Sequence, residues 1–326
     1  MRRSTRQLCL LSAIAVVIMI AFHFLLDTAN LRVVTGVYMW IGLALSWNII
    51  GGYAGYLSFG HAAFFGVGAY TTAILMTTFG WPFLLAVLAG GFGGGVLATV
   101  ISMPTLRLSG AYFAIATWAV ALCLMQLANV LEITGGAFGI SLPPTYGDAV
   151  FNVLMFILAW LVFFVTWHYV EHGAFGRKLE ALQENEVAAE MLGIDTNRQK
   201  LIAFILSAVF PALIGGVYAE WIVFIDPNAV FSFHISDPMV MMTILGGLGT
   251  VFGPILAAIV LYLLDRILWI NWSASTAYLI IIGLLTCGVV LYMPDGLMGM
   301  LKKLRSGKQE KQSAGSAEDM EDDAID

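Results

Sequence analysis

Long uncharged stretches constrain this chain more than any other feature of its sequence. Residues 33–106 contain no Asp, Glu, Lys or Arg, and five further stretches share this property: 108–131, 149–170, 201–219, 238–264 and 267–294. A bilayer core of roughly 30 Å needs about 20 apolar residues per helix. Only 11% of the residues are charged, against about 25% in soluble globular proteins. The sequence therefore predicts an all-α integral membrane protein, a polytopic bundle of about 8–10 transmembrane helices with glycine-broken or re-entrant segments.

One membrane domain accounts for most of the chain. We predict that residues 1–300 form this single transmembrane domain and that residues 301–326 form a disordered, charged cytoplasmic tail. The net charge of −6 comes largely from the acidic residues within 318–326. Such a run after a polar stretch is typical of a solubilising tail, with an interaction role as the alternative. The three cysteines have no metal-ligand spacing, so no metal site is predicted.

The clusters of Lys and Arg predict which parts of the chain face the cytoplasm. They lie near the N-terminus, within 177–200 and after residue 301, and cytoplasmic loops carry an excess of such residues. We therefore expect both termini and the charged stretch 171–200 on the cytoplasmic side. This requires residues 238–245 to form a half-helix that enters from outside, turns at the following glycines and returns through the next helix. The other predicted spans are 8–26, 33–50, 62–79, 83–103, 111–131, 149–170, 201–219, 251–264 and 276–293, with 220–237 as a loop.

Two glycine-rich breaks interrupt the apolar pattern and resemble each other. Residues 51–61 and 246–250 each begin with two glycines that follow two aliphatic residues. Glycine inside a helix costs about 1 kcal/mol relative to alanine. Paired glycine-interrupted segments in two halves of a chain point to a transport site, although close helix packing is an alternative explanation. The residues predicted to shape a translocation pathway are Gly51, Gly52, Gly55, Ser58, Gly60, His61, Gly246, Gly247 and Gly249.

His61 is the titratable side chain that the sequence places within the membrane region. It follows the first break, where it could cap the next helix or line a pathway. Irregular backbone at membrane depth is tolerated only when it is buried in protein or lines a water-filled cavity. The segment 51–61 as a whole is therefore a better site candidate than any single side chain.

Recognised catalytic signatures are absent from the sequence. It contains no His-Glu-x-x-His, no Gly-x-Ser-x-Gly and no Gly-x4-Gly-Lys-Ser/Thr loop for nucleotide phosphates. Charges within a membrane often mark ion coupling, but Glu132, Glu220, Asp265 and Arg266 fall at predicted span ends. We expect neither enzymatic activity nor a cofactor, and we expect energy to arrive from other proteins. A carrier that acts alone and is driven by an ion gradient is the rival hypothesis.

Residues 171–200 form the sizeable internal charged stretch. Leu179, Leu182, Ala189 and Leu192 could form one apolar stripe on a helix whose remaining surface carries glutamates. Such a helix can lie flat on a membrane or dock into a groove on a soluble partner. Acidic residues are unfavourable beside a negatively charged leaflet, so the pattern slightly favours a protein partner.

Five motifs, in order along the chain, resemble those of the M-type permease subunits of ATP-binding-cassette importers for branched-chain amino acids. The resemblance covers about residues 33–296. The motifs are Gly-Gly-Tyr-Ala-Gly-Tyr-Leu-Ser-Phe-Gly-His-Ala-Ala-Phe-Phe-Gly-Val-Gly-Ala-Tyr at 51–70, Arg-Leu-Ser-Gly-Ala-Tyr-Phe-Ala-Ile-Ala-Thr at 107–117, Thr-Gly-Gly-Ala-Phe-Gly-Ile at 134–140, Glu-Asn-Glu-Val-Ala-Ala-Glu-Met-Leu-Gly-Ile-Asp at 184–195 and Gly-Gly-Leu-Gly-Thr-Val-Phe-Gly-Pro at 246–254.

The resemblance implies a subunit that translocates leucine, isoleucine or valine across a bacterial cytoplasmic membrane. The implied partners are a second homologous permease, two cytoplasmic ATPase subunits, an extracytoplasmic substrate-binding protein and the lipid bilayer; no nucleic acid is expected. Related permeases carry urea or short amides, so these substrates stay open. Glu180 and Gln183 depart from the pattern, because basic residues are common at those positions. The resemblance assigns ATPase coupling to Glu184, Asn185, Glu186, Ala189 and Gly193.

Overall fold

A computed structural model describes residues 15–17, 19, 20, 26–272 and 283 of the 326-residue chain. Most of the predicted first span, nearly all of the last predicted span at 276–293 and the whole tail at 301–326 lie outside the described residues. In chain order the described elements are α2 (Thr28–Asn48), η1 (Ile49–Tyr53), α3 (His61–Thr77), α4 (Phe83–Thr105), α5 (Ala111–Val130), η2 (Glu132–Thr134), η3 (Gly136–Phe138), β1 (Ile140–Ser141), α6 (Asp148–Val165), η4 (Thr166–Glu171), α7 (Ala174–Glu184), α8 (Glu186–Met191), α9 (Thr196–Ile222), β2 (Phe224–Ile225), α10 (Pro227–Val230), α11 (Phe233–Gly246) and α12 (Phe252–Trp272).

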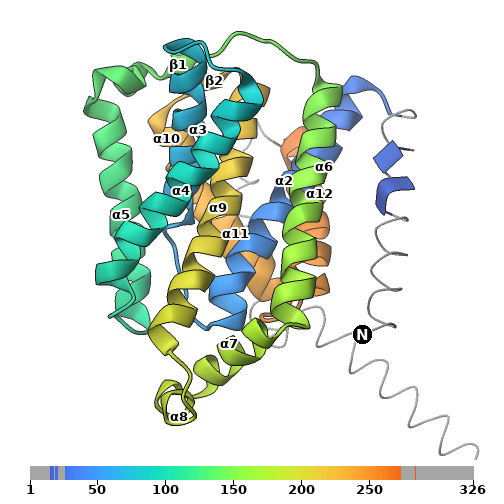
Figure 1. Cartoon of the computed structure of the whole chain (residues 1–326). Coiled ribbons are helices and arrows are strands. Elements are labelled where there is room, and N and C mark those ends of the chain that lie inside the picture. Colours follow the sequence, from blue (N-terminus) through green and yellow to red (C-terminus); the bar gives the residue numbers. More distant parts are fainter. Residues whose placement is uncertain (1–14, 18, 21–25, 273–282, 284–326) are drawn as a thin grey trace, which may run out of the picture.

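The described helices form an elongated bundle with two distinct ends. Figure 1 shows α7 and α8 projecting from one end, here called the α7–α8 end, while β1, β2 and α10 lie toward the other, here called the strand end. The two strands are antiparallel, with Ile140 opposite Ile225. Seven helical stretches among the described residues are long and apolar enough to cross a membrane. The predicted class, an all-α polytopic membrane protein, is confirmed.

Helix α9 occupies the centre of the bundle and packs against α2, α3, α4 and α6. Its side chains Phe204 and Ala208 are fully buried, and Phe204 meets the ring of Phe64 on α3 edge-on at 5.5 Å. By contrast, α5 stands at the edge of the bundle in Figure 1, and only 22% of its apolar stretch is buried. Within the described residues, the chain therefore covers α5 much less than it covers α9.

The predicted span 62–79 is a helix, but it begins part of the way along the bundle. His61, the first residue of α3, lies 3.2 Å from the hydroxyl of Ser207 on α9. At about 1.5 Å per residue, Ser207 is roughly 17 Å from the start of α9 and roughly 23 Å from its end. Residues 54–60, which precede α3, are not helical. This non-helical segment connects η1 at the α7–α8 end with the start of α3 at the middle of the bundle.

Two features of the predicted second half are wrong in the structure. The expected loop 220–237 is mostly structured, because α9 continues to Ile222 and is followed by β2, α10 and the first turn of α11. The expected half-helix at 238–245 begins five residues earlier, at Phe233, and residues 227–246 together are long enough to span a membrane. The uncharged stretch 238–264 suggested a start at residue 238, but Pro238 lies inside α11.

Candidate functional site

The two glycine breaks, which begin at residues 51 and 246, meet at the α7–α8 end. Asn48, the last residue of α2, donates from Nδ2 to the carbonyl oxygen of Thr250 at 2.8 Å and accepts from the backbone N–H of Gly249 at 3.1 Å. A Cβ on Gly52 would collide with Asn48 Oδ1 and lie 2.6 Å from the Gly249 nitrogen. The absence of a side chain at Gly52 thus permits the direct contact between the breaks.

The first break rises from this contact toward the middle of the bundle. The indole N–H of Trp47 donates to the carbonyl oxygen of Ser58 at 2.6 Å, and the backbone N–H of Phe59 donates to Thr117 on α5 at 3.3 Å. A Cβ on Gly60 would clash with the backbone carbonyl oxygen of Thr117. Glycine at position 60 therefore lets the non-helical segment lie directly against α5.

His61 lies at the upper end of this segment and is fully buried. Its Nδ1 is 3.1 Å from the Ser58 hydroxyl and its Nε2 is 3.2 Å from the Ser207 hydroxyl. The ring also lies edge-on to Phe64 and Phe204. In this conformation both nitrogens have partners and the imidazole faces no open space, so it holds α3 against α9.

The nine residues predicted to shape a pathway thus fall into two groups. The group at the contact between the breaks consists of Gly51, Gly52, Gly246, Gly247 and Gly249. The group at the middle of the bundle consists of Ser58, Gly60 and His61, while Gly55 lies between them beside the side chain of Gln183 on α7. A role in solute movement stays a prediction for all nine.

The predicted coupling segment forms two short helices separated by one residue. Asn185 lies between α7 and α8, and its side-chain oxygen accepts from the backbone N–H of Ala188 in the first turn of α8. Gly193 follows α8 with φ of 80° and lets the chain turn toward α9. Glu184 is exposed and Ala189 is buried. The sequence therefore folds locally into a helix–break–helix unit, which Figure 1 shows extending beyond the ends of α6 and α9.

The predicted apolar stripe on this segment divides between the interior and the surface. Leu179, Leu182 and Ala189 are buried against the chain, whereas Leu192 is 79% exposed. The exposed apolar surface of α8 comes instead from Val187, Met191 and Leu192. We call these three residues the α8 patch. We had expected all four stripe residues to face one surface, a membrane or a partner. Instead, the three buried ones attach α7 and α8 to the bundle.

Glu186 joins α8 to both the first break and α9. Its carboxylate forms an ion pair with Lys200, a residue only 4% exposed, and accepts a hydrogen bond from the Tyr56 hydroxyl at 3.0 Å. The Lys200 ammonium also lies 5.2 Å from the centre of the Tyr56 ring. Partial burial raises the pKa of Glu186, but hydrogen bonds from Lys200, Tyr56 and Thr196 outweigh it and lower the pKa below its usual value. Glu186 therefore stays ionised at neutral pH.

Gln183 makes a second connection between α7 and the first break. Its amide, oriented with the nitrogen toward the bundle, donates to the carbonyl oxygens of Gly52 and Tyr53 at 3.2 Å each. The π-helical turn η1 leaves such carbonyl groups without regular helical partners, and turns of this kind are frequent at functional sites. Any displacement of α7 and α8 is therefore transmitted by hydrogen bonds to the backbone of the break.

Sequence reasoning missed several residues that connect these parts. Asn48 had a visible signal, because an amide within an uncharged apolar span must find hydrogen-bond partners. Tyr56 and Lys200 carried no such signal, since their role depends on Glu186, which lies 130 and 14 residues away respectively. The α8 patch was missed because periodicity alone could not tell the buried face of α8 from the exposed one.

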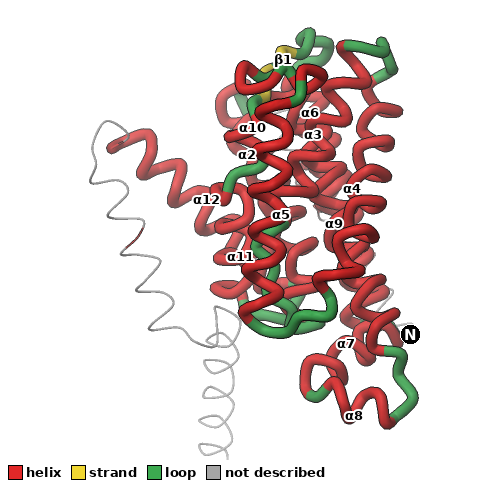
Figure 2. Tube along the Cα trace, turned by 90° about the vertical axis from the view of Figure 1, so that its left-hand side faces the viewer, coloured by secondary structure: helices red, strands yellow, loops and turns green. Residues whose placement is uncertain are grey.

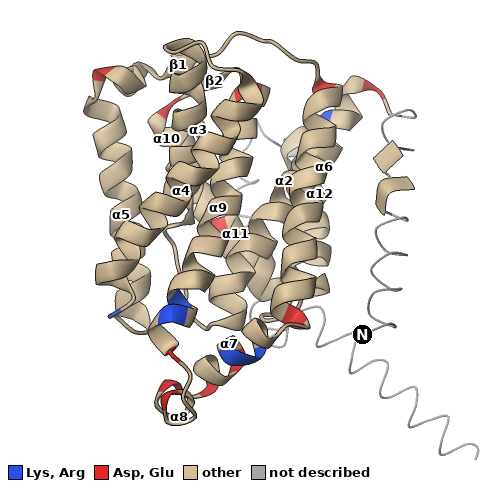
Figure 3. Ribbon diagram, in the orientation of Figure 1, with Lys and Arg blue, Asp and Glu red and all other residues tan. Residues whose placement is uncertain are grey.

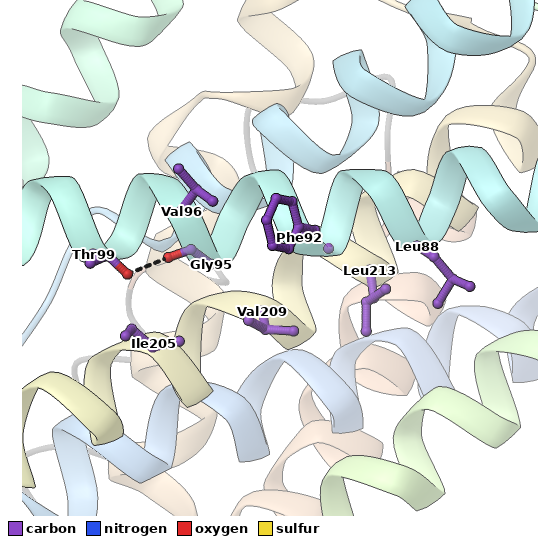
Figure 4. A pocket seen from close by; sticks show the side chains of 9 residues that line it. Leu88, Phe92, Gly95, Val96, Thr99, Ile205, Val209 and Leu213 are labelled. Carbon is purple, nitrogen blue, oxygen red and sulfur yellow. Dashed lines mark hydrogen bonds between the residues drawn. The ribbon is translucent and has the colours of Figure 1, made fainter.

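An apolar groove of about 440 Å³ lies on the outside of the bundle between α4 and α9. Figure 4 shows Leu88, Phe92 and Val96 of α4 and Leu213 of α9 along it. Its one hydroxyl, on Thr99, donates within α4 to the carbonyl oxygen of Gly95 at 2.9 Å. This groove offers no free polar group to a charged solute, so it is not a candidate for the solute pathway.

Residues 29–289 match the family model described as "Branched-chain amino acid transport system / permease component". The chain is 29% identical to the high-affinity branched-chain amino acid transport system permease protein LivM of Salmonella typhimurium, over 91% of this chain and 77% of that protein. It is 23% identical to a probable LivM of Methanocaldococcus jannaschii, over 82% of this chain and 94% of the relative. It is also 21% identical to the permease protein LivH of Escherichia coli K12, over 79% of this chain and 90% of the relative. No solved structure matches the chain.

Proposed function

The chain belongs to the family of branched-chain amino acid transport system permease components, and on that premise we propose that it is a membrane subunit of an ATP-driven importer of leucine, isoleucine and valine. The observation that carries the proposal is the family match over residues 29–289 on a bundle of membrane-spanning helices. The named relatives LivM and LivH are both permeases of branched-chain amino acid transport systems. The second permease of the proposed importer would be a protein of this same family.

The proposed orientation places the α7–α8 end in the cytoplasm. Figure 3 shows basic segments gathered mainly near that end. Within the described part of the chain, the loop and helix termini there carry Arg107, Arg177, Lys178, Arg198 and Lys200. An excess of Lys and Arg is the mark of cytoplasmic loops. Ten crossings result from the seven long stretches, the non-helical segment 54–60 together with α3, and the two spans predicted outside the described residues, so both termini would also be cytoplasmic.

We assign coupling to ATP hydrolysis to the α7–α8 unit. The α8 patch is exposed, with Val187 64%, Met191 85% and Leu192 79% accessible. A small apolar surface on a projecting helix is the feature by which helices dock into grooves of partner proteins. The hydrogen bonds of Glu186 to Tyr56 and of Gln183 to Gly52 connect this unit to the first break. Closure of two ATPase subunits would thus act on the contact between the breaks.

Reconstitution of the importer tests the proposed function. The permease, its homologous partner, the two ATPases and the binding protein are inserted into liposomes, and uptake of labelled leucine is measured with and without ATP. We expect uptake that requires ATP and all subunits. Uptake of urea or a short amide in place of leucine would change the substrate assignment. Accumulation by the chain alone under a Na⁺ or H⁺ gradient would contradict the ATP-driven mechanism.

Replacement of Met191 by glutamate tests the α8 patch. The added charge would have to be desolvated in an apolar groove, so we expect weaker association with the ATPase and about tenfold less uptake. Met191→Leu keeps the apolar surface and serves as the matched control, for which we expect uptake near the wild-type rate. Co-purification of the ATPase with each variant is the measurement. Wild-type co-purification of Met191→Glu would show that the patch is not the docking surface.

A further inference from the structure

An acidic side chain lies at the middle of the bundle, where the sequence had suggested an external loop. Asp237 is the fifth residue of α11. Its neighbour Ser236 accepts a hydrogen bond at 2.8 Å from the backbone N–H of Ala62, one residue after the mid-depth His61. Gly246 at the α7–α8 end is nine residues further on, about 14 Å along a helix. In Figure 3 an acidic segment beside the α11 label stands midway between the two charged ends.

In the described part of the chain, the partner of the Asp237 carboxylate is His234, with which it interacts electrostatically. Asp237 is partly exposed, and no hydrogen bond or ion pair joins its carboxylate to any described residue. The salt bridges found there join Arg32 to Asp148 and Lys200 to Glu186. A carboxylate at membrane depth is costly unless it faces a water-filled space or a partner. We therefore expect the Asp237 carboxylate to face a water-filled space or a binding partner rather than lipid.

Aromatic rings surround the same face of α11. Phe233 lies four residues before Asp237, and residues at this spacing share one side of a helix. The Phe233 ring is 5.8 Å from that of Phe59 in the first break and 6.2 Å from that of Trp118 on α5. Phe233 and Trp118 are 43% and 44% exposed. This face is thus lined by α11, the non-helical segment and α5, and Figure 2 shows α5 on the side that faces the viewer.

Further polar groups lie beside the carboxylate. His234, exposed and three residues before Asp237, interacts electrostatically with it. An imidazole donates at least one N–H in either tautomer. Pro238 has no N–H, so it cannot donate to the carbonyl oxygen of His234 as a residue inside a helix normally would. The face therefore combines acceptors, a donor and apolar rings within two turns of helix.

We propose that Asp237, with His234 and the rings of Phe233, Phe59 and Trp118, forms a binding site for a zwitterionic amino acid with an apolar side chain. The Asp237 carboxylate binds the ammonium group, and the imidazole of His234 donates to the carboxylate of the solute. The rings contact the aliphatic side chain and attract the ammonium group through their faces. This site rests on the proposed transport function and specifies where the solute binds. It places the solute at the point where the first break, α5 and α11 meet.

Uptake by the reconstituted importer is the first test. We expect Asp237→Asn to lower the maximal uptake of leucine about tenfold, since an amide replaces a charged acceptor. ATP hydrolysis stimulated by the loaded binding protein should continue. The number of ATP molecules hydrolysed per leucine transported should therefore rise. Asp237→Glu should recover much of the uptake. Glu132→Gln, a neutralised carboxylate in the loop after α5, is the matched control and should behave as wild type.

Direct binding is the second test. Saturation-transfer NMR on the importer in nanodiscs, without binding protein, compares leucine with isoamylamine, which lacks the carboxylate, and with 4-methylpentanoate, which lacks the ammonium group. We expect Asp237→Asn to remove the signals of leucine and isoamylamine, and His234→Phe to weaken those of leucine and 4-methylpentanoate.

Three outcomes would overturn the site. The first is uptake by Asp237→Asn at the wild-type rate. The second is equal binding of all three ligands by wild type and Asp237→Asn. The third is loss of the second permease from Asp237→Asn during purification, which would assign the carboxylate to an ion pair between subunits. Failure of the wild-type importer to take up leucine with ATP would instead contradict the proposed function itself.

Discussion

Replacing Glu186 with lysine is expected to uncouple ATP hydrolysis from transport while the chain still inserts into the membrane. The change removes the anion that pairs with Lys200, which is only 4% exposed, and places a second ammonium group beside it. Removing one partner of a buried ion pair costs about 3–5 kcal/mol, and the partial exposure of Glu186 reduces this to about 1–2 kcal/mol. A loss of about 1.4 kcal/mol is tenfold in an equilibrium. We expect uptake and stimulated ATP hydrolysis to fall by about that factor.

The matched control for this prediction is Glu180→Lys, which makes the same charge reversal on exposed α7. It should retain most of the uptake, because Glu180 has no described hydrogen bond or ion pair to the first break, and its interaction with Tyr53 there is electrostatic only. Glu186→Gln should lie between the two, since an amide can still accept from Tyr56. Membrane yield and co-purification of the second permease check insertion and assembly. Coupled transport by Glu186→Lys at the wild-type rate would contradict the assignment of Glu186 as the connection between α8 and the first break.

The ionised state of Glu186 also predicts how this connection responds to pH. The pKa of Glu186 in the folded protein is lowered from the usual 4.5. A carboxylate whose pKa is lowered by folding contributes stability above its unfolded pKa, and that stability is lost as the pH falls through the folded value. Near neutral pH the ion pair is therefore complete, and the connection should not vary with pH in that range.

Replacing Gly52 with valine is expected to separate the two glycine breaks and to abolish most transport. The new Cβ would overlap Asn48 Oδ1 and lie 2.6 Å from the Gly249 nitrogen, so the backbone must move. Movement would break the two hydrogen bonds of the Asn48 amide, which donates to the Thr250 carbonyl oxygen and accepts from the Gly249 N–H. Overpacking costs about 1–3 kcal/mol, and each lost hydrogen bond adds about 1 kcal/mol. We expect uptake to fall by tenfold or more.

Gly147→Ala is the matched control, because nothing lies within 4 Å of a Cβ at that position. Thermal unfolding followed in detergent separates loss of the fold from loss of the contact between the breaks. Asn48→Leu should reproduce the transport defect of Gly52→Val without overpacking at position 52. If Gly52→Val transported leucine normally, the contact would be a packing feature of the bundle with no part in the transport cycle.

Features that depend on local composition were predictable from the sequence. Uncharged stretches as long as 33–106 require a membrane, because too few polar groups are present to cover a soluble surface. Consecutive glycines predicted the breaks, and the charged stretch predicted the projecting α7–α8 unit. The position of α11 was not predictable in the same way. The uncharged stretch 238–264 suggested a helix start after Asp237, and the apolar residues on both sides left the depth of Asp237 open.

Amino-acid sequence by itself determined the class of this protein, its two glycine breaks and its charged internal segment, because each of these follows from the chemistry of neighbouring residues. The tertiary structure alone decided that Asn48 meets Thr250 across 202 residues and that Tyr56 meets Glu186 across 130 residues. It also decided that Asp237 stands at mid-depth, one helical turn after Phe233, whose ring meets those of Phe59 and Trp118. These contacts depend on how far each helix is displaced along its neighbours, and a pattern of single residues does not specify that displacement.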